Sequence, residues 1–238
     1  MHVRPVFLGR EPVVQRLVEM SWQDSTHLRA PWIEAEPELA TSDPRFELDR
    51  RAFALDLLRT GRISAERADS LATFAVREAY ARKVPPALVF GVLLTENDGL
   101  RSSARSNVGA VGLMQIHPPA WKRSLGRYFG TNLRDDETNL RYGVYILRHL
   151  IARVPDSAGM GDGWRTALLR YNGCVRGTNT PNCHSYPDLV KREVEEGALA
   201  LCGGASFEQC VAQPLWLSVR EDGAKSDPTL RLTRVASR

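Results

Sequence analysis

Hydrophobic residues along the chain recur at helical rather than strand spacing. From residue 46 onwards, apolar side chains return every three or four positions, the period of one face of an α-helix. These runs predict helices over residues 46–59, 64–84, 86–96, 140–151, 164–171 and 187–201. Residues 119–121 suggest a further short helix, which residues 128–130 break. The alternation that marks β-strands does not persist anywhere. The sequence therefore predicts a mainly α fold.

Length and composition fit one domain with an extension at each end. The chain has 238 residues, of which 43% are hydrophobic and 25% charged, as in ordinary globular domains. We expect a partly ordered N-terminal extension over residues 1–45, a helical domain over residues 46–201, and a C-terminal extension and tail over residues 202–238. The net charge is +4, but basic residues are scattered among acidic ones, which argues against a nucleic-acid-binding protein. This mild excess suits an anionic polymer, or is ordinary surface charge.

The candidate chemistry centres on Glu96, the last residue of a predicted apolar helix. On a helical period Glu96 shares a face with Val89 and Val92, so a carboxyl group continues an apolar stripe. Burial and the negative end of the helix dipole both favour the neutral acid, which a general acid needs near neutral pH. Gly99 lies where a left-handed residue would end the helix. The alternative is a solvated glutamate at a helix end.

A glycine-bearing loop over residues 105–112 follows this helix and leads into Leu113-Met114-Gln115. Its glycines allow a tight backbone path and the close approach of a ligand. Gln115 brings amide donors and an acceptor to the loop. Two later stretches also carry polar side chains at helix ends: an asparagine opens residues 139–147, and residues 171–173 read Tyr-Asn-Gly.

Together these stretches resemble the soluble lytic transglycosylase (SLT) family. Residues 96–100 and 106–115 are similar to its pattern of a Glu-Ser pair followed by Gly-Ala-x-Gly-Leu-Met-Gln. Residues 139–147 are similar to its Asn-(Ile/Leu)-x-x-Gly-x-x-Tyr-Leu helix start, and residues 171–173 to its Ala-Tyr-Asn-Ala-Gly stretch. The motifs occur in the family's order. The resemblance covers residues 65–195 and implies a lysozyme-like helical fold for the catalytic domain.

The resemblance implies a peptidoglycan lytic transglycosylase, a carbon–oxygen lyase of the cell wall. In that family the glutamate matched by Glu96 protonates the β-1,4 bond between MurNAc and GlcNAc. The sugar's own acetamido group assists, and the glutamate then acts as a base while a 1,6-anhydro ring closes. One carboxylate suffices, whereas most glycosidases use two. The sequence agrees, because Asp98 lies on another helical face and residues 135–137 look like helix caps.

Six further residues receive substrate-binding or supporting roles from their positions in the matched motifs. They are Gln115, Tyr171, Ser106, Asn172, Met114 and His117. Tyr171 is expected to approach Glu96 or the acetamido group, with aromatic core packing as the alternative. Gln115 is expected to donate to a bound sugar, with a bond to the loop backbone as the alternative. Asn172 is expected to hold its loop rather than touch substrate. Ser106 matches the family's serine that hydrogen-bonds the acid. The glutamate-to-glycine spacing is one residue longer than in the family, so Ser102 or Ser103 could take that place.

Three positions depart from the family's pattern. Asn97 stands where a Ser usually follows the glutamate, His117 where a Met is common, and Cys174 where a small residue is usual. Asn97 can still form hydrogen bonds, so these departures bear on details of sugar binding more than on the reaction. The other histidines lack ligand spacing, so we expect no metal and no cofactor.

The four cysteines predict two local disulfides, Cys174–Cys183 and Cys202–Cys210, although four cysteines allow three pairings. Such bridges indicate an oxidising compartment, so we expect a periplasmic or extracellular protein. Reduced thiols in a cytosolic protein are the alternative. Residues 1–20 carry charges throughout and lack the apolar core of a signal peptide, so no export signal is visible in this chain.

The expected partner is the peptidoglycan glycan strand. We expect no nucleic acid and no integral membrane segment, because no stretch is long and apolar enough to span a bilayer. A monomer is expected, and an envelope or secretion complex is a candidate partner. Two other functions fit the same fold. One is a goose-type hydrolytic lysozyme, and the other is a non-catalytic wall-binding protein.

Overall fold

The computed structural model describes residues 41, 43–154, 160–174 and 183–211, and this part of the chain folds into helices without a β-strand. The mainly α fold is confirmed. The helices, in chain order, are α3 (Phe46–Arg59), α4 (Ala65–Ala81), α5 (Pro86–Glu96), α6 (Pro118–Phe129), α7 (Asp136–Ala152), α8 (Met160–Tyr171), the 3₁₀ helix η2 (Cys183–Ser185), α9 (Tyr186–Gly197), α10 (Leu199–Cys202) and α11 (Phe207–Val211). Most of the predicted extensions, at residues 1–40 and 212–238, lies outside the described residues.

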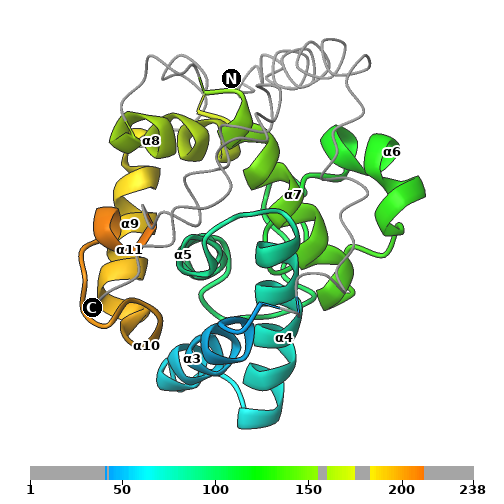
Figure 1. The fold of residues 1–238 in the computed structure, drawn as a ribbon. Helices are drawn as coiled ribbons and strands as arrows, with labels where there is room; N and C mark the ends of the chain where they lie inside the picture. The colour runs from blue at the N-terminus through cyan, green and yellow to red at the C-terminus, as the bar shows by residue number, and fades with distance from the viewer. Residues whose placement is uncertain (1–40, 42, 155–159, 175–182, 212–238) are drawn as a thin grey trace, which may run out of the picture.

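Helix α5 lies at the centre of the fold, with the other helices arranged around it (Figure 1). Every residue from Pro86 to Leu94 is buried, so α5 is core on all sides rather than an amphipathic helix with one apolar face. Its closest neighbour is α9, and the two can approach because Gly91 has no side chain at the crossing.

Helix α5 has only eleven residues. None of the described helices combines the length and apolar character that crossing a bilayer requires.

Helices α4 and α7 pack against each other on one side of α5 (Figure 1), and a buried ion-pair network joins them. Glu78 of α4 is inaccessible to solvent and pairs with Arg82 of its own helix and with Arg141 of α7. The apolar face of α7 is buried: Tyr142, Tyr145, Ile146 and Leu150. Asp135, which the sequence predicts as a helix cap, and Ser64 are both N-caps, because their side chains accept the third backbone N–H of α7 and α4 respectively.

Three helix boundaries differ from the prediction. Helix α7 begins at Asp136, four residues before the predicted start at residue 140. Helix α8 begins at Met160, four residues before the predicted start at residue 164, because glycines in a first helical turn cost little where few backbone bonds are made. The predicted single helix over residues 187–201 is two helices, α9 and α10, broken at Ala198. The break has a tertiary cause: the buried carboxylate of Asp56 in α3 accepts the backbone N–H groups of Ala200 and Leu201, which opens a new helix there.

The close approach of α5 and α9 predicts that Gly91→Ala destabilises the protein. A Cβ at Gly91 would lie 2.6 Å from a methyl of Val194 and 2.9 Å from the Val190 carbonyl oxygen, closer than packed atoms allow. We expect the free energy of unfolding to fall by roughly 1–3 kcal/mol, measured by urea denaturation. The control is Gly126→Ala in α6, where the nearest atom is a Thr131 methyl at 3.2 Å that can move. Equal stability of the two variants would contradict this packing.

Candidate active site

Glu96 ends α5, and its carboxyl group is half-buried among protein atoms. The hydroxyl of Tyr186, the first residue of α9, donates a hydrogen bond of 2.6 Å to Glu96 Oε1. Two effects act on the carboxyl pKa. Burial raises it, because water no longer solvates the charged form, and the Tyr186 hydrogen bond partly opposes this by stabilising the carboxylate. The net result is a pKa of about 7 instead of 4.5.

A carboxyl group with this pKa can work as an acid and as a base near neutral pH. Both protonation states are populated around pH 7, so one side chain can give a proton and later take one. Among the residues that the structure describes, no second carboxylate hydrogen-bonds Glu96 or shifts its pKa. Asp98 is exposed, and its backbone carbonyl accepts from Arg62. The geometry therefore suits one-carboxylate chemistry.

The chain leaves α5 through Asn97 rather than through a left-handed Gly99. Asn97 is buried, and its side-chain amide donates to the Arg101 carbonyl at 2.7 Å and accepts from the Arg101 N–H at 3.2 Å. A weaker bond of 3.3 Å reaches the Gly112 carbonyl. The positive φ falls at Leu100, at 49°, so the prediction for Gly99 is wrong. Side-chain bonds from Asn97, and not a glycine cap, turn the chain here.

The glycine loop is fastened to α7 by the buried amide of Asn139. Its Nδ2 donates to the carbonyls of Val111 and Leu133 at 2.9 and 2.8 Å, and its Oδ1 accepts the Met114 N–H at 2.7 Å. Gly112, with φ of 83°, lies directly against this amide, where a Cβ would be 2.2 Å from Nδ2. Two isolated antiparallel bridges, from Val111 to Arg105 and to Ile116, complete the loop. A buried amide with all three of these bonds made holds the loop in one position.

Met114, Gln115 and Tyr171 meet at the end of this loop. The Tyr171 hydroxyl donates to the Met114 carbonyl at 2.9 Å rather than to Glu96. Burial and the charge of Glu96 both raise the pKa of Tyr171, so its hydroxyl lies in the electric field of the carboxyl group. Gln115 has a left-handed backbone, with φ of 45°, and its Nε2 donates to the Gly112 carbonyl at 2.8 Å. The side-chain oxygen of Gln115 has no bond within the described residues, so it can face a ligand.

The other predicted residues form no hydrogen bond with Glu96 within the described part of the chain. Ser106 accepts the Ala110 N–H within the loop, and Ser102 accepts from Arg67, so neither serine hydrogen-bonds Glu96. His117 lies just before the first residue of α6. Asn172 follows the last residue of α8, and its backbone N–H donates to the Leu168 carbonyl.

Sequence reasoning missed Tyr186, the residue in direct contact with the carboxyl group. Tyr186 lies four and eight residues before Val190 and Val194, so it reads as one member of an apolar helical stripe. That packing role is real, because Tyr186 is 5% exposed. Its hydroxyl reaches Glu96 across 90 residues of sequence, and no local pattern encodes such a contact.

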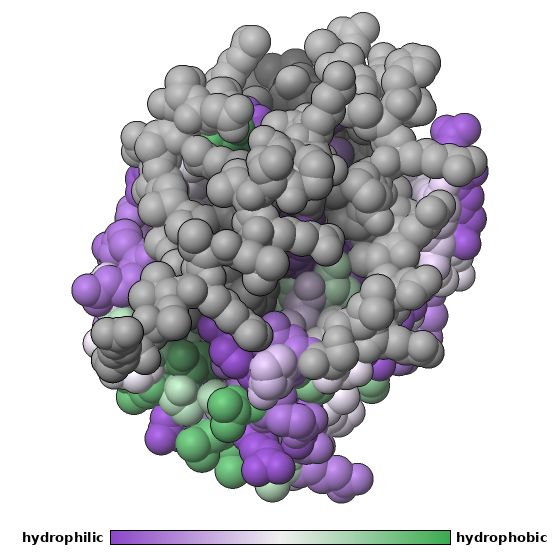
Figure 2. Space-filling model, in the orientation of Figure 1, coloured by the Kyte–Doolittle hydropathy of each residue, from purple (hydrophilic) through white to green (hydrophobic). Residues whose placement is uncertain are grey.

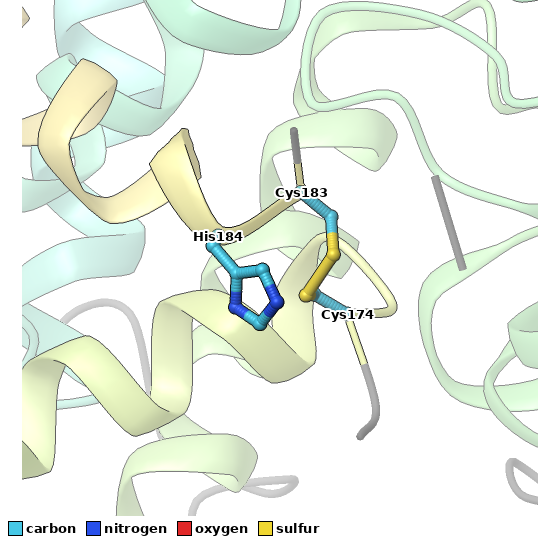
Figure 3. A group of neighbouring side chains, drawn as sticks. All are labelled: Cys174, Cys183 and His184. Atoms are coloured by element: carbon cyan, nitrogen blue, oxygen red, sulfur yellow. A yellow bond between two sulfur atoms is a disulfide. The ribbon is translucent and has the colours of Figure 1, made fainter. Parts of the chain in front are cut away.

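Both predicted disulfides are present, Cys174–Cys183 and Cys202–Cys210. The first lies three residues after Tyr171 and three residues before Tyr186, so it joins the ends of the two segments that carry the site tyrosines. His184 lies beside this bridge (Figure 3), and ligand atoms of the three side chains lie within 4.8 Å of one another. The two sulfurs are bonded to each other, so they are not the thiolates that a cysteine metal site requires.

Comparison with known families identifies the domain. Residues 74–182 match the family model described as Transglycosylase SLT domain, which confirms the resemblance that the sequence motifs indicate. The match includes Glu96, the glycine loop and Tyr171 and ends four residues before Tyr186. Comparison with curated proteins and with solved structures gave no match. At the level of the family, this match supports a lytic transglycosylase-type function directed at peptidoglycan, and SLT proteins act on the cell wall.

The raised pKa predicts how Glu96→Gln changes stability with pH. Between pH 4.5 and 7 the unfolded chain releases this proton while the folded protein retains it, so the free energy of unfolding of the parent protein falls as pH rises. The difference between 4.5 and about 7 corresponds to about 3 kcal/mol, an upper limit. Glutamine does not titrate, so urea denaturation should show the variant gaining stability over the parent between pH 4 and pH 8. The same difference at both pH values would contradict a desolvated Glu96.

Proposed function

We propose that this protein cleaves the β-1,4 bond between MurNAc and GlcNAc without consuming water and releases 1,6-anhydro-MurNAc ends. The SLT domain supports action on peptidoglycan. The observation that carries the finer proposal is the desolvated carboxyl of Glu96, with a pKa of about 7 and a tyrosine hydroxyl on one oxygen.

In the first step the protonated Glu96 donates its proton to the glycosidic oxygen, and the C1–O bond breaks. The substrate's acetamido oxygen stabilises the positive charge at C1 from the opposite face. In the second step the ionised Glu96 takes the proton of the sugar's 6-hydroxyl, whose oxygen attacks C1 and closes the anhydro ring. The carboxyl group ends as it began, protonated, and no water enters the products.

The hydrogen bonds of Glu96 support different roles for its two carboxyl oxygens. Oε1 accepts from Tyr186, whereas Oε2 has no hydrogen bond within the described residues. We assign both proton transfers to Oε2. The Tyr186 hydroxyl then stabilises the carboxylate in the interval between the two transfers, because a hydrogen bond to an ionised group is stronger than one to a neutral group.

Supporting roles follow from the contacts around the loop. Gln115 uses one amide N–H on Gly112, which leaves its carbonyl oxygen and second N–H for a sugar. Tyr171 fixes the Met114 carbonyl and so positions the peptide bond that precedes Gln115. Asn172 remains predicted to hold its loop, and Ser106 and His117 remain predicted supporting residues. The two disulfides support a periplasmic or extracellular location, because such bridges persist in oxidising compartments.

Product analysis tests this function. Purified peptidoglycan digested with the protein should release muropeptides with 1,6-anhydro ends, identified by mass spectrometry. Reducing ends instead would identify a hydrolytic lysozyme. Glu96→Gln should lower the rate of release by about a thousandfold or more, because it removes the acid and base of both steps while circular dichroism shows a folded protein. Full activity of Glu96→Gln would exclude the mechanism, and no release by the parent protein would favour a non-catalytic wall-binding protein.

Removing the Tyr186 hydroxyl should shift the pH dependence of cleavage. Tyr186→Phe takes away a bond to the charged form of Glu96, so the pKa of Glu96 rises further. The alkaline limb of kcat/KM reports loss of the protonated acid and should move upward by about one pH unit. Tyr171→Phe is the matched control, because its hydroxyl donates to the Met114 carbonyl instead, and its limb should stay in place. An alkaline limb at the same pH in both variants would show that the Tyr186 hydroxyl does not set the pKa of Glu96.

A further inference from the structure

Helix α6 carries a basic surface that has no acidic partner among the residues the structure describes. Its twelve residues include Lys122, Arg123 and Arg127 and no aspartate or glutamate. All three cations are exposed, and none forms an ion pair within the described residues. We call these three residues the α6 basic face. Figure 2 shows hydrophilic residues along the right-hand edge of the molecule, where Figure 1 places α6.

Several cations on other helices have acidic partners. Arg67 pairs with Asp136, Arg141 with Glu78 and Glu137, and Arg165 with Asp188. The acidic residues that follow α6 along the chain are already engaged: Asp135 caps α7, Asp136 holds Arg67, and Glu137 holds Arg77 and Arg141. The α6 basic face is therefore not neutralised by its nearest carboxylates.

The spacing on α6 places like charges together. Arg123 and Arg127 are four residues apart, which puts them on one face with Cβ atoms about 6 Å from each other, an arrangement that destabilises a helix. The opposite face is apolar and packed, because Leu125 and Phe129 are buried. Arg127 lies over the ring of Tyr128, 4.6 Å from its centroid, and this ring is 45% exposed. An external anion bound there would reduce the repulsion between Arg123 and Arg127, and the Tyr128 ring lies beside Arg127.

The position of α6 relative to the proposed sugar site suggests which anion. Helix α6 begins three residues after Gln115, so the site loop runs directly into it. With a rise of about 1.5 Å per residue, Arg123 and Arg127 lie roughly 8 and 14 Å along the helix from Pro118. An extended peptide of four residues spans at most about 14 Å. Peptides of this length, bearing free carboxylates, hang from the muramic acid of peptidoglycan.

We infer that the α6 basic face binds the carboxylates of the stem peptides on a glycan strand held at the proposed site. This inference rests on the proposed function, because it takes peptidoglycan as the substrate. The inference adds to the proposed function a preference for glycan strands that carry stem peptides over bare glycan strands. The contact is electrostatic and exposed, so it weakens as salt rises.

The test measures binding without cleavage, with Glu96→Gln present in every protein. Titration calorimetry gives the Kd for uncrosslinked glycan strands of matched length, either with stem peptides or stripped of them by an amidase. The α6 variant is Arg123→Gln with Arg127→Gln. The control is Arg51→Gln with Arg192→Gln, which removes the same charge from exposed positions on α3 and α9.

The α6 variant should bind peptide-bearing strands about fivefold more weakly than the control, and both should bind stripped strands equally. Unchanged binding of peptide-bearing strands would overturn the inference, and so would an equal loss on stripped strands. Vesicles containing phosphatidylglycerol form a further arm: if the α6 variant loses vesicle binding alone, the face docks on a membrane and the inference is wrong. Because no arm depends on cleavage, product analysis can fail while this binding result stands.

Discussion

Desolvation of the Glu96 carboxyl is the effect on which the proposed chemistry depends. It arises because α5 is buried from Pro86 to Leu94, so the carboxyl group that ends the helix lies at the edge of the core. A general acid at neutral pH must keep its proton, and a base must be able to lose it. Burial raises the pKa and the Tyr186 hydroxyl limits the rise, so that the carboxyl group titrates near pH 7.

The surroundings of Glu96 are held by bonds from side chains to backbone, and not by a sheet. Asn97 ties the end of α5 to the following loop, and Asn139 ties that loop to α7. The Cys174–Cys183 bridge joins the ends of the segments that bear Tyr171 and Tyr186. Irregular backbone needs such partners when it is buried, because an unpaired N–H or carbonyl group costs more than a lost contact. The loop can therefore be both irregular and rigid.

Charge is used in two ways in this fold. Between α4 and α7, arginines and glutamates pair across the helix interface, and Glu78 is buried completely within that network. On α6, cations stand together without acids. Buried charges need partners inside the molecule, whereas exposed charges without partners remain available to a ligand. The first arrangement belongs to folding, and the second can serve recognition.

Local sequence patterns predicted the helices α3 to α7, the burial of α5 and the cap Asp135, because these depend on residues within one or two turns. Cysteine spacing predicted both disulfides for the same reason. The split between α9 and α10 required Asp56 from α3, and the contact between Tyr186 and Glu96 required two helices to pack. The helical period of a sequence indicates which face of a helix is buried, but not which atoms a side chain on that face contacts. Contacts between residues distant in sequence therefore emerged only from the folded structure.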